Sequence, residues 1–151
     1  MKKKGLPPVP IVFDYLITAQ NNSLYNTLPI FSVYIADLVF QHLLKLGGIS
    51  AQQERNEKKA RLLYFLLEKA EKEGKVDLVV QQGVRSRMNV PFKFKSKDID
   101  AEFVKEAEKN GMMQLKGHRS VGGIRASLYN AITVENVETL VEFLKEFLNK
   151  L

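Results

Sequence analysis

The most apolar stretch of the chain runs from about Thr27 to Leu46, and its pattern predicts a helix. Proline is favoured in the first turn of a helix, which suits Pro29, and the glycine pair Gly47-Gly48 supplies a stop. Apolar side chains would occur on nearly all sides of this helix. A helix of that kind is buried between layers or between subunits.

The next stretch, from Ser50 to Gly74, predicts a helix of a different kind. Ser50 and Gln53 have the spacing of a capping box, so we expect the helix to begin at Ser50. Its apolar positions fall on one stripe, which packs a single face against a core. The stripe consists of Ala60, Leu63, Tyr64, Leu67 and Ala70.

Alternating positions further along predict a small sheet. Met88 to Phe94 alternates apolar and polar residues, and the runs 76–80, 112–116 and 124–129 also have strand character. Pro91 cannot donate a ladder hydrogen bond, so we expect its strand to lie at an edge or to carry a bulge. Helices are expected from Asp98 to Asn110 and after a capping Thr133.

These elements predict an α/β fold in which helices pack on a mostly antiparallel sheet. The pattern also divides the chain into two parts. Residues 1–46 hold an irregular proline-containing arm and the apolar helix, and residues 47–151 hold the α/β domain.

Composition removes several classes of function. The 151 residues include no cysteine and two histidines, so disulfides and thiolate chemistry are excluded, and no metal-ligand spacing occurs. The net charge is +6, but most lysines alternate with glutamates as on a solvated helix surface. We therefore expect no nucleic-acid partner. No apolar run reaches membrane-spanning length and no secretory signal is evident, which favours a cytoplasmic protein without a membrane partner.

The candidate chemistry is concentrated in one glycine-containing loop. His118 and Arg119 lie at its start and Arg125 just beyond its end. Arginine pairs bidentately with carboxylate or phosphate, and a neighbouring histidine can donate to the same anion. The loop therefore predicts a receptor for a small polyanion. Ser120 is not a credible nucleophile, because no carboxylate follows to orient a histidine base.

Three strings, in order, resemble the phosphoserine aminotransferase family, which belongs to the class-V aminotransferases and depends on pyridoxal phosphate. They span much of the region from Pro10 to Leu151, which resembles the C-terminal part of these enzymes. The first string has Leu28 where the family usually has a proline. The three strings are NSLYNT from Asn22 followed by Pro29, RSRMNVPF from Arg85, and KGHRSVGGIRAS from Lys116.

The resemblance implies that residues 1–46 are a remnant of the large-domain end with the interdomain helix, and that residues 47–151 are the small C-terminal domain of a fold-type I transferase. It also implies a reaction in serine biosynthesis. The family transfers an amino group between glutamate and 3-phosphohydroxypyruvate, and it works as a homodimer. By motif position, Arg125 would hold the substrate α-carboxylate. His118 and Arg119 would hold the distal phosphate or the side-chain carboxylate of glutamate. Asn26 and Thr27 would bind the phosphate of pyridoxal phosphate.

The resemblance also implies that the Schiff-base lysine of the family lies upstream of this chain. Lys2, Lys3 and Lys4 stand on a proline-flanked arm that lacks the fixed, desolvated setting such a lysine requires. We therefore expect no catalytic residue in this chain and no activity from the chain alone. The alternative is a truncated, non-catalytic derivative that acts as an anion-binding, dimerising module.

Overall fold

The computed structural model describes residues 10–151, so the lysines of the N-terminal arm lie outside the described residues. The chain divides into two compact units, one ending at His42 and one running from Leu43 to Leu151. The predicted boundary after residue 46 remains a prediction. Within residues 10–151, no single helix is long and apolar enough to cross a membrane. Only helices α2 (Ile30–Lys45) and α3 (Gly48–Lys72), counted together, pass such a test, by length and composition alone.

Over residues 10–42 the first unit is helical and has no buried residue. It contains a 3-10 turn at Ile11–Phe13, helix α1 at Tyr15–Gln20 and most of helix α2 at Ile30–Lys45. The predicted apolar helix is confirmed in extent. None of its side chains is buried in the described structure.

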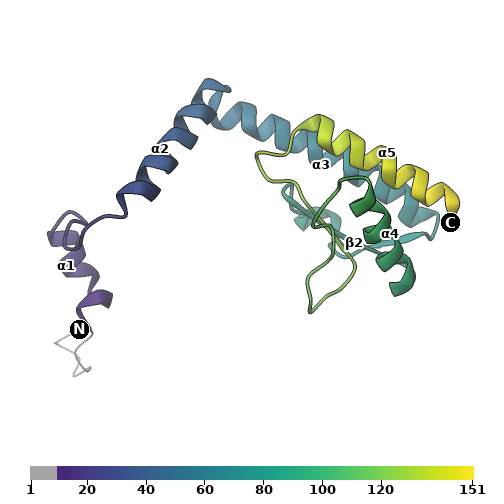
Figure 1. The fold of residues 1–151 in the computed structure, drawn as a ribbon, viewed down its shortest axis with the longest axis horizontal. Helices are drawn as coiled ribbons and strands as arrows, with labels where there is room; N and C mark the ends of the chain where they lie inside the picture. Colours follow the sequence, from purple (N-terminus) through teal and green to yellow (C-terminus); the bar gives the residue numbers. More distant parts are fainter. Residues whose placement is uncertain (1–9) are drawn as a thin grey trace. The chain divides into compact units, whose positions relative to one another are not determined.

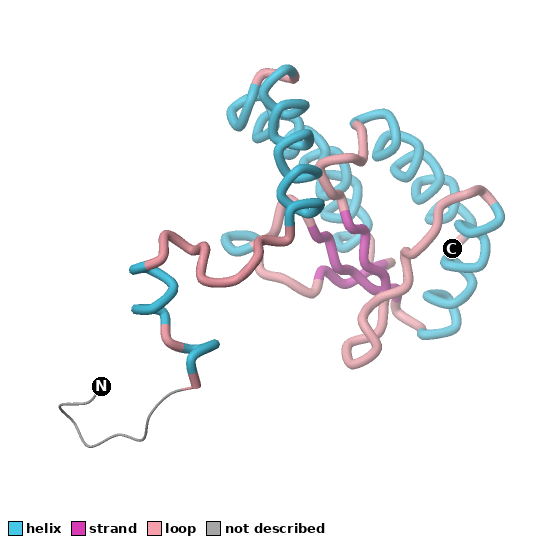
Figure 2. The backbone as a smooth tube through the Cα atoms, turned by 60° about the vertical axis from the view of Figure 1, so that its left-hand side comes forward, coloured by secondary structure: helices cyan, strands magenta, loops and turns pink. Residues whose placement is uncertain are grey.

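The second unit is built on a three-stranded sheet in the order β1-β2-β3, with both pairs antiparallel. Its strands are β1 (Val76–Leu78), β2 (Asn89–Phe94) and β3 (Ile124–Ser127). Its helices are α3 (Gly48–Lys72), α4 (Lys97–Lys109) and α5 (Val134–Lys150). Figure 1 shows α5 lying beside α3, and Figure 2 shows the strands side by side as a small sheet. The predicted fold class is confirmed.

The core forms on one face of this sheet. Val90, Phe92 and Phe94 alternate along β2 and are buried, whereas the residues between them are more exposed. Phe103 of α4 and Phe147 of α5 lie 5.3 Å from the Phe94 ring, centroid to centroid. The opposite face of the sheet is therefore left to polar side chains.

The expected position of Pro91 is wrong, because β2 is the central strand. No bulge interrupts its pairing, since Pro91 lies opposite Arg125 in continuous register. Backbone groups alternate in direction along a strand, and Met88 O accepts from Leu128 N on the β3 side. The Pro91 nitrogen therefore faces the β1 side, where pairing has already ended at Phe92. A proline there costs no ladder hydrogen bond.

Two further expectations about element ends are wrong. Helix α3 begins at Gly48 rather than at Ser50, and its N-cap Gly47 has a φ of 97° with no side-chain cap. The predicted strand at 112–116 is reduced to a bridge between Lys116 and Ile124, because Gln114 has a φ of 65°. A left-handed residue breaks the extended path that a strand needs.

Candidate functional site

The glycine loop, residues 117–123, closes a hairpin next to β3. Gly117 N donates to Gly123 O at 2.8 Å, and Arg125 N donates to Leu115 O at 2.8 Å. Within the loop, Val121 N and Gly122 N both donate to His118 O. These bonds hold a tight turn, and Figure 1 shows it projecting from the sheet.

Gly123 has a structural reason to lack a side chain. Its φ is +71°, and an added Cβ would lie 2.7 Å from Phe92 O of the neighbouring strand. Only glycine combines that backbone conformation with so close an approach. The loop is therefore fixed against β2 at this point.

All three sequence-predicted anion ligands lie on this hairpin and are exposed. His118 and Arg119 belong to the glycine loop itself. Arg125 is the second residue of β3, with its side chain on the face opposite the core. The two pockets described in the second unit are lined by other residues. The polyanion receptor expected from the sequence therefore stays a prediction.

The histidine of the loop is oriented by Ser120. Ser120 N donates to His118 Nδ1 at 3.2 Å, and the Ser120 hydroxyl lies 2.7 Å from the same nitrogen. A backbone N–H can only donate, so Nδ1 acts as acceptor. The neutral imidazole then carries its proton on Nε2, which is available to donate to an anion. In the sequence, only the two-residue spacing between His118 and Ser120 indicated that Ser120 could orient the histidine.

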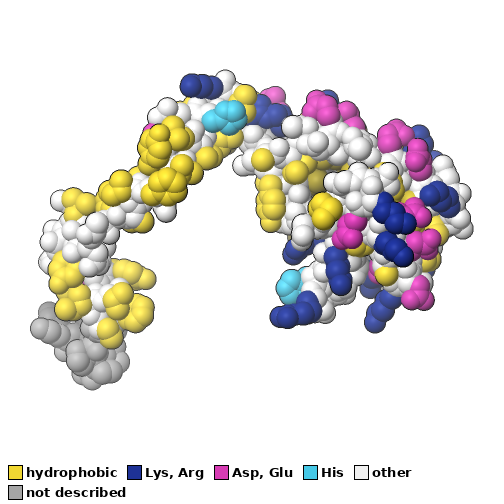
Figure 3. Space-filling view, in the orientation of Figure 1, with side chains coloured by type: hydrophobic (Ala, Val, Ile, Leu, Met, Phe, Trp, Pro, Cys, Tyr) yellow, Lys and Arg dark blue, Asp and Glu magenta, His cyan; other side chains and the backbone are white. Residues whose placement is uncertain are grey.

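The surroundings of the loop add positive charge. Lys116 precedes the loop, and Lys93 lies on the outer face of β2, two residues from the partner of Arg125. Across residues 10–151, no ion pair within 4.0 Å involves Lys93, Lys116, Arg119 or Arg125. Figure 3 shows Lys and Arg side chains gathered at the end of the unit where the hairpin projects. Such a surface attracts anions.

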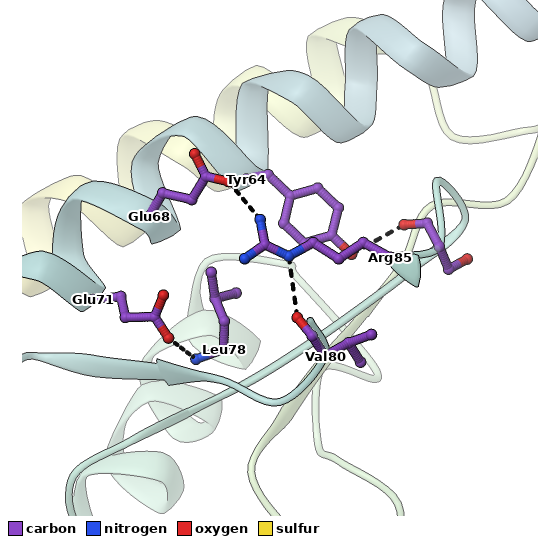
Figure 4. Close-up of polar contacts among 7 residues, drawn as sticks. Tyr64, Glu68, Glu71, Leu78, Val80 and Arg85 are labelled. Atoms are coloured by element: carbon purple, nitrogen blue, oxygen red, sulfur yellow. Dashed lines mark hydrogen bonds and ion pairs between the residues drawn. The ribbon is translucent and has the colours of Figure 1, made fainter. Parts of the chain in front are cut away.

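The arginines of the RSRMNVPF string have structural roles. Arg85 donates to Glu68 Oε1 at 2.5 Å and to Val80 O at 3.1 Å, and its guanidinium lies 5.0 Å from the centre of the Tyr64 ring. Figure 4 shows this cluster between α3 and the loop after β1. Burial raises the pKa of Tyr64, which donates to Ser86 O. Arg87 pairs with Glu57 at 3.1 Å.

The buried Lys59 is a residue that the sequence did not single out. Its side chain is 1% exposed, and its ammonium donates to Leu128 O, Tyr129 O and Ile132 O at 3.2, 2.9 and 2.8 Å. These carbonyls follow β3 directly, so Lys59 ties the segment after β3 to α3. An amine bound by three carbonyls is a structural group and leaves no room for a nucleophilic role.

Asn26 and Thr27 belong to the first unit and lie just before α2. Both are exposed, and among the described residues no hydrogen bond engages either side chain. Asn22 and Ser23 have φ values of 51° and 63°, so the chain turns sharply ahead of them. An amide and a hydroxyl with free donors suit the oxygens of a phosphate. The chemistry of this donor set fits the phosphate of pyridoxal phosphate.

Comparison with known proteins gives one family. The model of the class-V aminotransferases matches residues 10–140. The phosphoserine aminotransferase of Saccharomyces cerevisiae is 50% identical over 146 residues, which is 97% of this chain and 36% of that protein. The chloroplastic phosphoserine aminotransferase 1 of Arabidopsis thaliana is 50% identical over 138 residues, 91% of this chain and 32% of that protein.

Solved structures give the same result. The phosphoserine aminotransferase from Bacillus circulans subsp. alkalophilus superposes with a TM-score of 0.88 at 40% identity, over 94% of this chain and 39% of that one. A pyridoxal-phosphate-bound phosphoserine aminotransferase from Trichomonas vaginalis gives 0.80 at 38% identity, over 93% and 39%. The chain thus spans 32–39% of the length of these four proteins.

Proposed function

The chain belongs to the class-V aminotransferase family, and from this premise we propose that it supplies the substrate-binding loop of a phosphoserine aminotransferase. The proposed reaction moves an amino group between glutamate and 3-phosphohydroxypyruvate in serine biosynthesis. The observation that carries the proposal is a constrained hairpin whose two arginines have no ion-pair partner within residues 10–151 and whose histidine has its Nε2 left to donate. Both substrates are multiply charged anions, which such a surface would bind.

In this proposal each basic side chain has one task. Arg125 holds the α-carboxylate through its planar fork, because the rigid β3 strand fixes where its side chain begins. His118 and Arg119 hold the distal group, which is the phosphate of one substrate and the side-chain carboxylate of the other. The protein therefore orients its substrate and neutralises its charge.

Pyridoxal phosphate is the proposed cofactor, and Asn26 and Thr27 are the residues that would hold its phosphate. When bound, it supplies the electron sink for bonds at the substrate α-carbon. We further propose that the working enzyme is a cytoplasmic homodimer that binds no nucleic acid. A second candidate is an anion-binding, dimerising module without turnover, which the exposed apolar helix α2 favours.

Arg125→Ala in an enzyme that contains this chain is the direct test. Loss of one bidentate carboxylate contact removes about 1.5–3 kcal/mol, so KM for both amino-acid substrates should rise roughly 10- to 150-fold. Arg125→Lys keeps the charge without the fork and should recover part of the loss. The control is Lys97→Ala, an exposed lysine on α4. Unchanged KM values in Arg125→Ala would remove Arg125 from this role.

Two measurements test the two candidates, and only the second separates them. Titration with O-phospho-L-serine, followed by amide resonances of residues 117–125, should shift these signals in both cases. Transamination of O-phosphoserine with 2-oxoglutarate should be undetectable for the chain alone and present in the complete enzyme. Turnover by the chain alone would contradict that expectation, and absence of turnover from the complete enzyme would favour the binding module.

A further inference from the structure

A groove of about 680 Å³ runs between α3 and α5, on a part of the second unit that the glycine loop does not reach. On α3 its lining positions follow a three- and four-residue spacing from Lys58 to Glu73, which is one face of the helix. Those positions span about four turns, or roughly 22 Å. The groove is therefore elongated along the helix.

The floor of this groove is apolar. Leu62 and Leu66 of α3 and Val141 of α5 are half-buried, and they pack against the core from outside it. Phe65 stands beside them with 75% of its surface exposed. An exposed aromatic side chain next to an apolar concave surface is typical of an interaction site rather than of a solvated helix face.

The rim of this groove carries an excess of positive charge. It contains five basic side chains and only two acidic ones, Glu73 and Glu142. Glu73 already lies 4.0 Å from one lysine of the rim and 3.9 Å from another. Within the described part of the chain, no ion pair involves Lys58, Arg61 or Lys145. The five basic residues are Lys58, Arg61, Lys69, Lys75 and Lys145.

The distribution of these charges indicates the shape of the occupant. Lys58 and Arg61 lie in the first turn of the groove, Lys69 about two turns further, and Lys75 past the end of α3. Lys145 lines the groove from α5. An amphiphile with a single charged head would need its cations gathered at one end. Cations spread along about 22 Å instead suit a ligand whose negative charges are spread along its length.

We propose that the groove between α3 and α5 binds an acidic amphipathic helix of a partner protein. Leucine-type side chains at three- and four-residue spacing would pack on the Leu62–Leu66 floor and against Phe65, as in other helix-in-groove complexes. Carboxylates on the flanks of that helix would pair with Lys58, Arg61 and Lys145. This proposal does not depend on the aminotransferase assignment, because it uses none of the residues of the glycine loop.

The test uses a synthetic amphipathic peptide of 16 residues with leucine at core-facing positions and glutamate on both flanks. Its binding to the 151-residue chain is measured by fluorescence anisotropy and by resonance shifts of α3 and α5. A matched peptide with lysine in place of glutamate is the control. We expect saturable binding of the acidic peptide, at least tenfold tighter than the basic one, with shifts confined to the groove.

Two groove variants check the mode of binding. Phe65→Ala removes an exposed side chain, so the fold should persist while peptide affinity falls at least tenfold. The triple reversal Lys58→Glu, Arg61→Glu, Lys145→Glu should abolish binding of the acidic peptide and create binding of the basic one. The control variant reverses the same number of exposed charges on α4, through Lys97→Glu, Lys105→Glu and Lys109→Glu. It should weaken binding of the acidic peptide less than threefold. Circular dichroism confirms that each variant is folded.

Four outcomes would overturn the proposal. The first is equal loss of affinity in the α4 reversal, which would mean general attraction to a basic protein. The second is unchanged affinity in Phe65→Ala. In the third, the chain binds no peptide but self-associates, and Phe65→Ala makes it monomeric. The groove would then be occupied by a second copy of the chain. In the fourth, a longer protein containing this chain fails to bind the peptide that the chain itself binds.

Discussion

At the scale of single residues, Lys59 shows how one buried cation can hold two elements together. Its ammonium accepts no bond and donates three, all to carbonyls of the segment between β3 and α5. Those carbonyls would be left without partners if the ammonium were removed, and each unpaired buried polar group is destabilising. Lys59 is thus the link between α3 and the strand that carries Arg125.

Lys59→Met is predicted to lower the free energy of unfolding by about 2–4 kcal/mol, because the side chain keeps its apolar length but leaves the three carbonyls unpaired. Its neighbour Lys58 is exposed, so Lys58→Met should change stability by less than about 0.5 kcal/mol. Urea denaturation of both variants measures the difference. Equal stabilities would show that the carbonyls find other partners.

The difference in stability between wild type and Lys59→Met is also predicted to depend on pH. Burial lowers the pKa of Lys59 below its ordinary value of 10.5, and the positive charge of Arg55 adds to this. Between the lowered value and 10.5 the unfolded chain binds more protons than the folded chain, so the stability contribution of Lys59 rises with pH. The stability gap between wild type and Lys59→Met should therefore widen as pH rises toward 10.5. A constant gap would contradict the lowered pKa.

Alanine substitutions at Gly123 and Gly122 distinguish two costs in the glycine loop, an unfavourable φ and a steric contact with β2. Gly123→Ala should cost about 2–3 kcal/mol, because it adds a contact with Phe92 O to an unfavourable φ of +71°. Gly122→Ala has φ +74° but open space around it, so it should cost only about 1 kcal/mol. Chemical denaturation gives both values. The reverse order would mean that β2 moves away without cost.

At the scale of elements, helix caps were partly readable from the sequence. Thr133 caps α5 as predicted, since its hydroxyl accepts from Asn136 N at 3.2 Å and Asn136 Oδ1 accepts from Thr133 N. Ser50 has the same kind of signal but lies inside α3. Gly47 decides the difference, because its left-handed conformation starts the helix earlier than the capping box would.

Thr133→Ala is therefore predicted to lower stability by about 1 kcal/mol, because the Asn136 N–H in the first turn of α5 loses its acceptor. Ser50→Ala should leave stability within about 0.5 kcal/mol of wild type or raise it slightly, since alanine has the higher helix propensity. Thermal unfolding followed by circular dichroism checks both. A comparable loss of stability in Ser50→Ala would show that Ser50 does cap the helix, as the sequence indicated.

At the scale of the whole molecule, the described residues form one unit with a core and one, residues 10–42, without a buried core. The core of the second unit is a continuous cluster that joins all three strands to α3, α4 and α5. The first unit has no buried residue among 10–42, and Figure 3 shows apolar side chains covering α2. A helix with apolar residues on nearly all sides gains free energy only when something covers it.

The isolated chain is accordingly predicted to self-associate through α2 at micromolar concentration. Phe31 and Phe40 are 75% and 63% exposed, so Phe31→Ser with Phe40→Ser should shift the chain toward monomer without loss of the second unit's fold. Val84→Ser, at a residue 74% exposed in the second unit, is the matched control. Sedimentation velocity measures the change. A monomeric unmodified chain would contradict the prediction.

The amino-acid sequence by itself determined most element types, though not the expected strand at 112–116, together with the core stripe of α3, the cap of α5 and the position of the loop with His118, Arg119 and Arg125. These features depend on local periodicity and on residue chemistry, which adjacent residues express without the rest of the fold. The resemblance to the aminotransferases likewise depends on short strings, and the comparisons confirmed the family.

Only the tertiary structure decided the place of Pro91 in the central strand, the role of Lys59 and the orientation of His118 by Ser120. Each depends on which backbone atoms approach from segments distant in sequence, or on the exact fold of a turn. Strand order is set by how sheet and helices bury a common core, and that contact is non-local. A lysine finds three carbonyls about 70 residues away only once that core has formed.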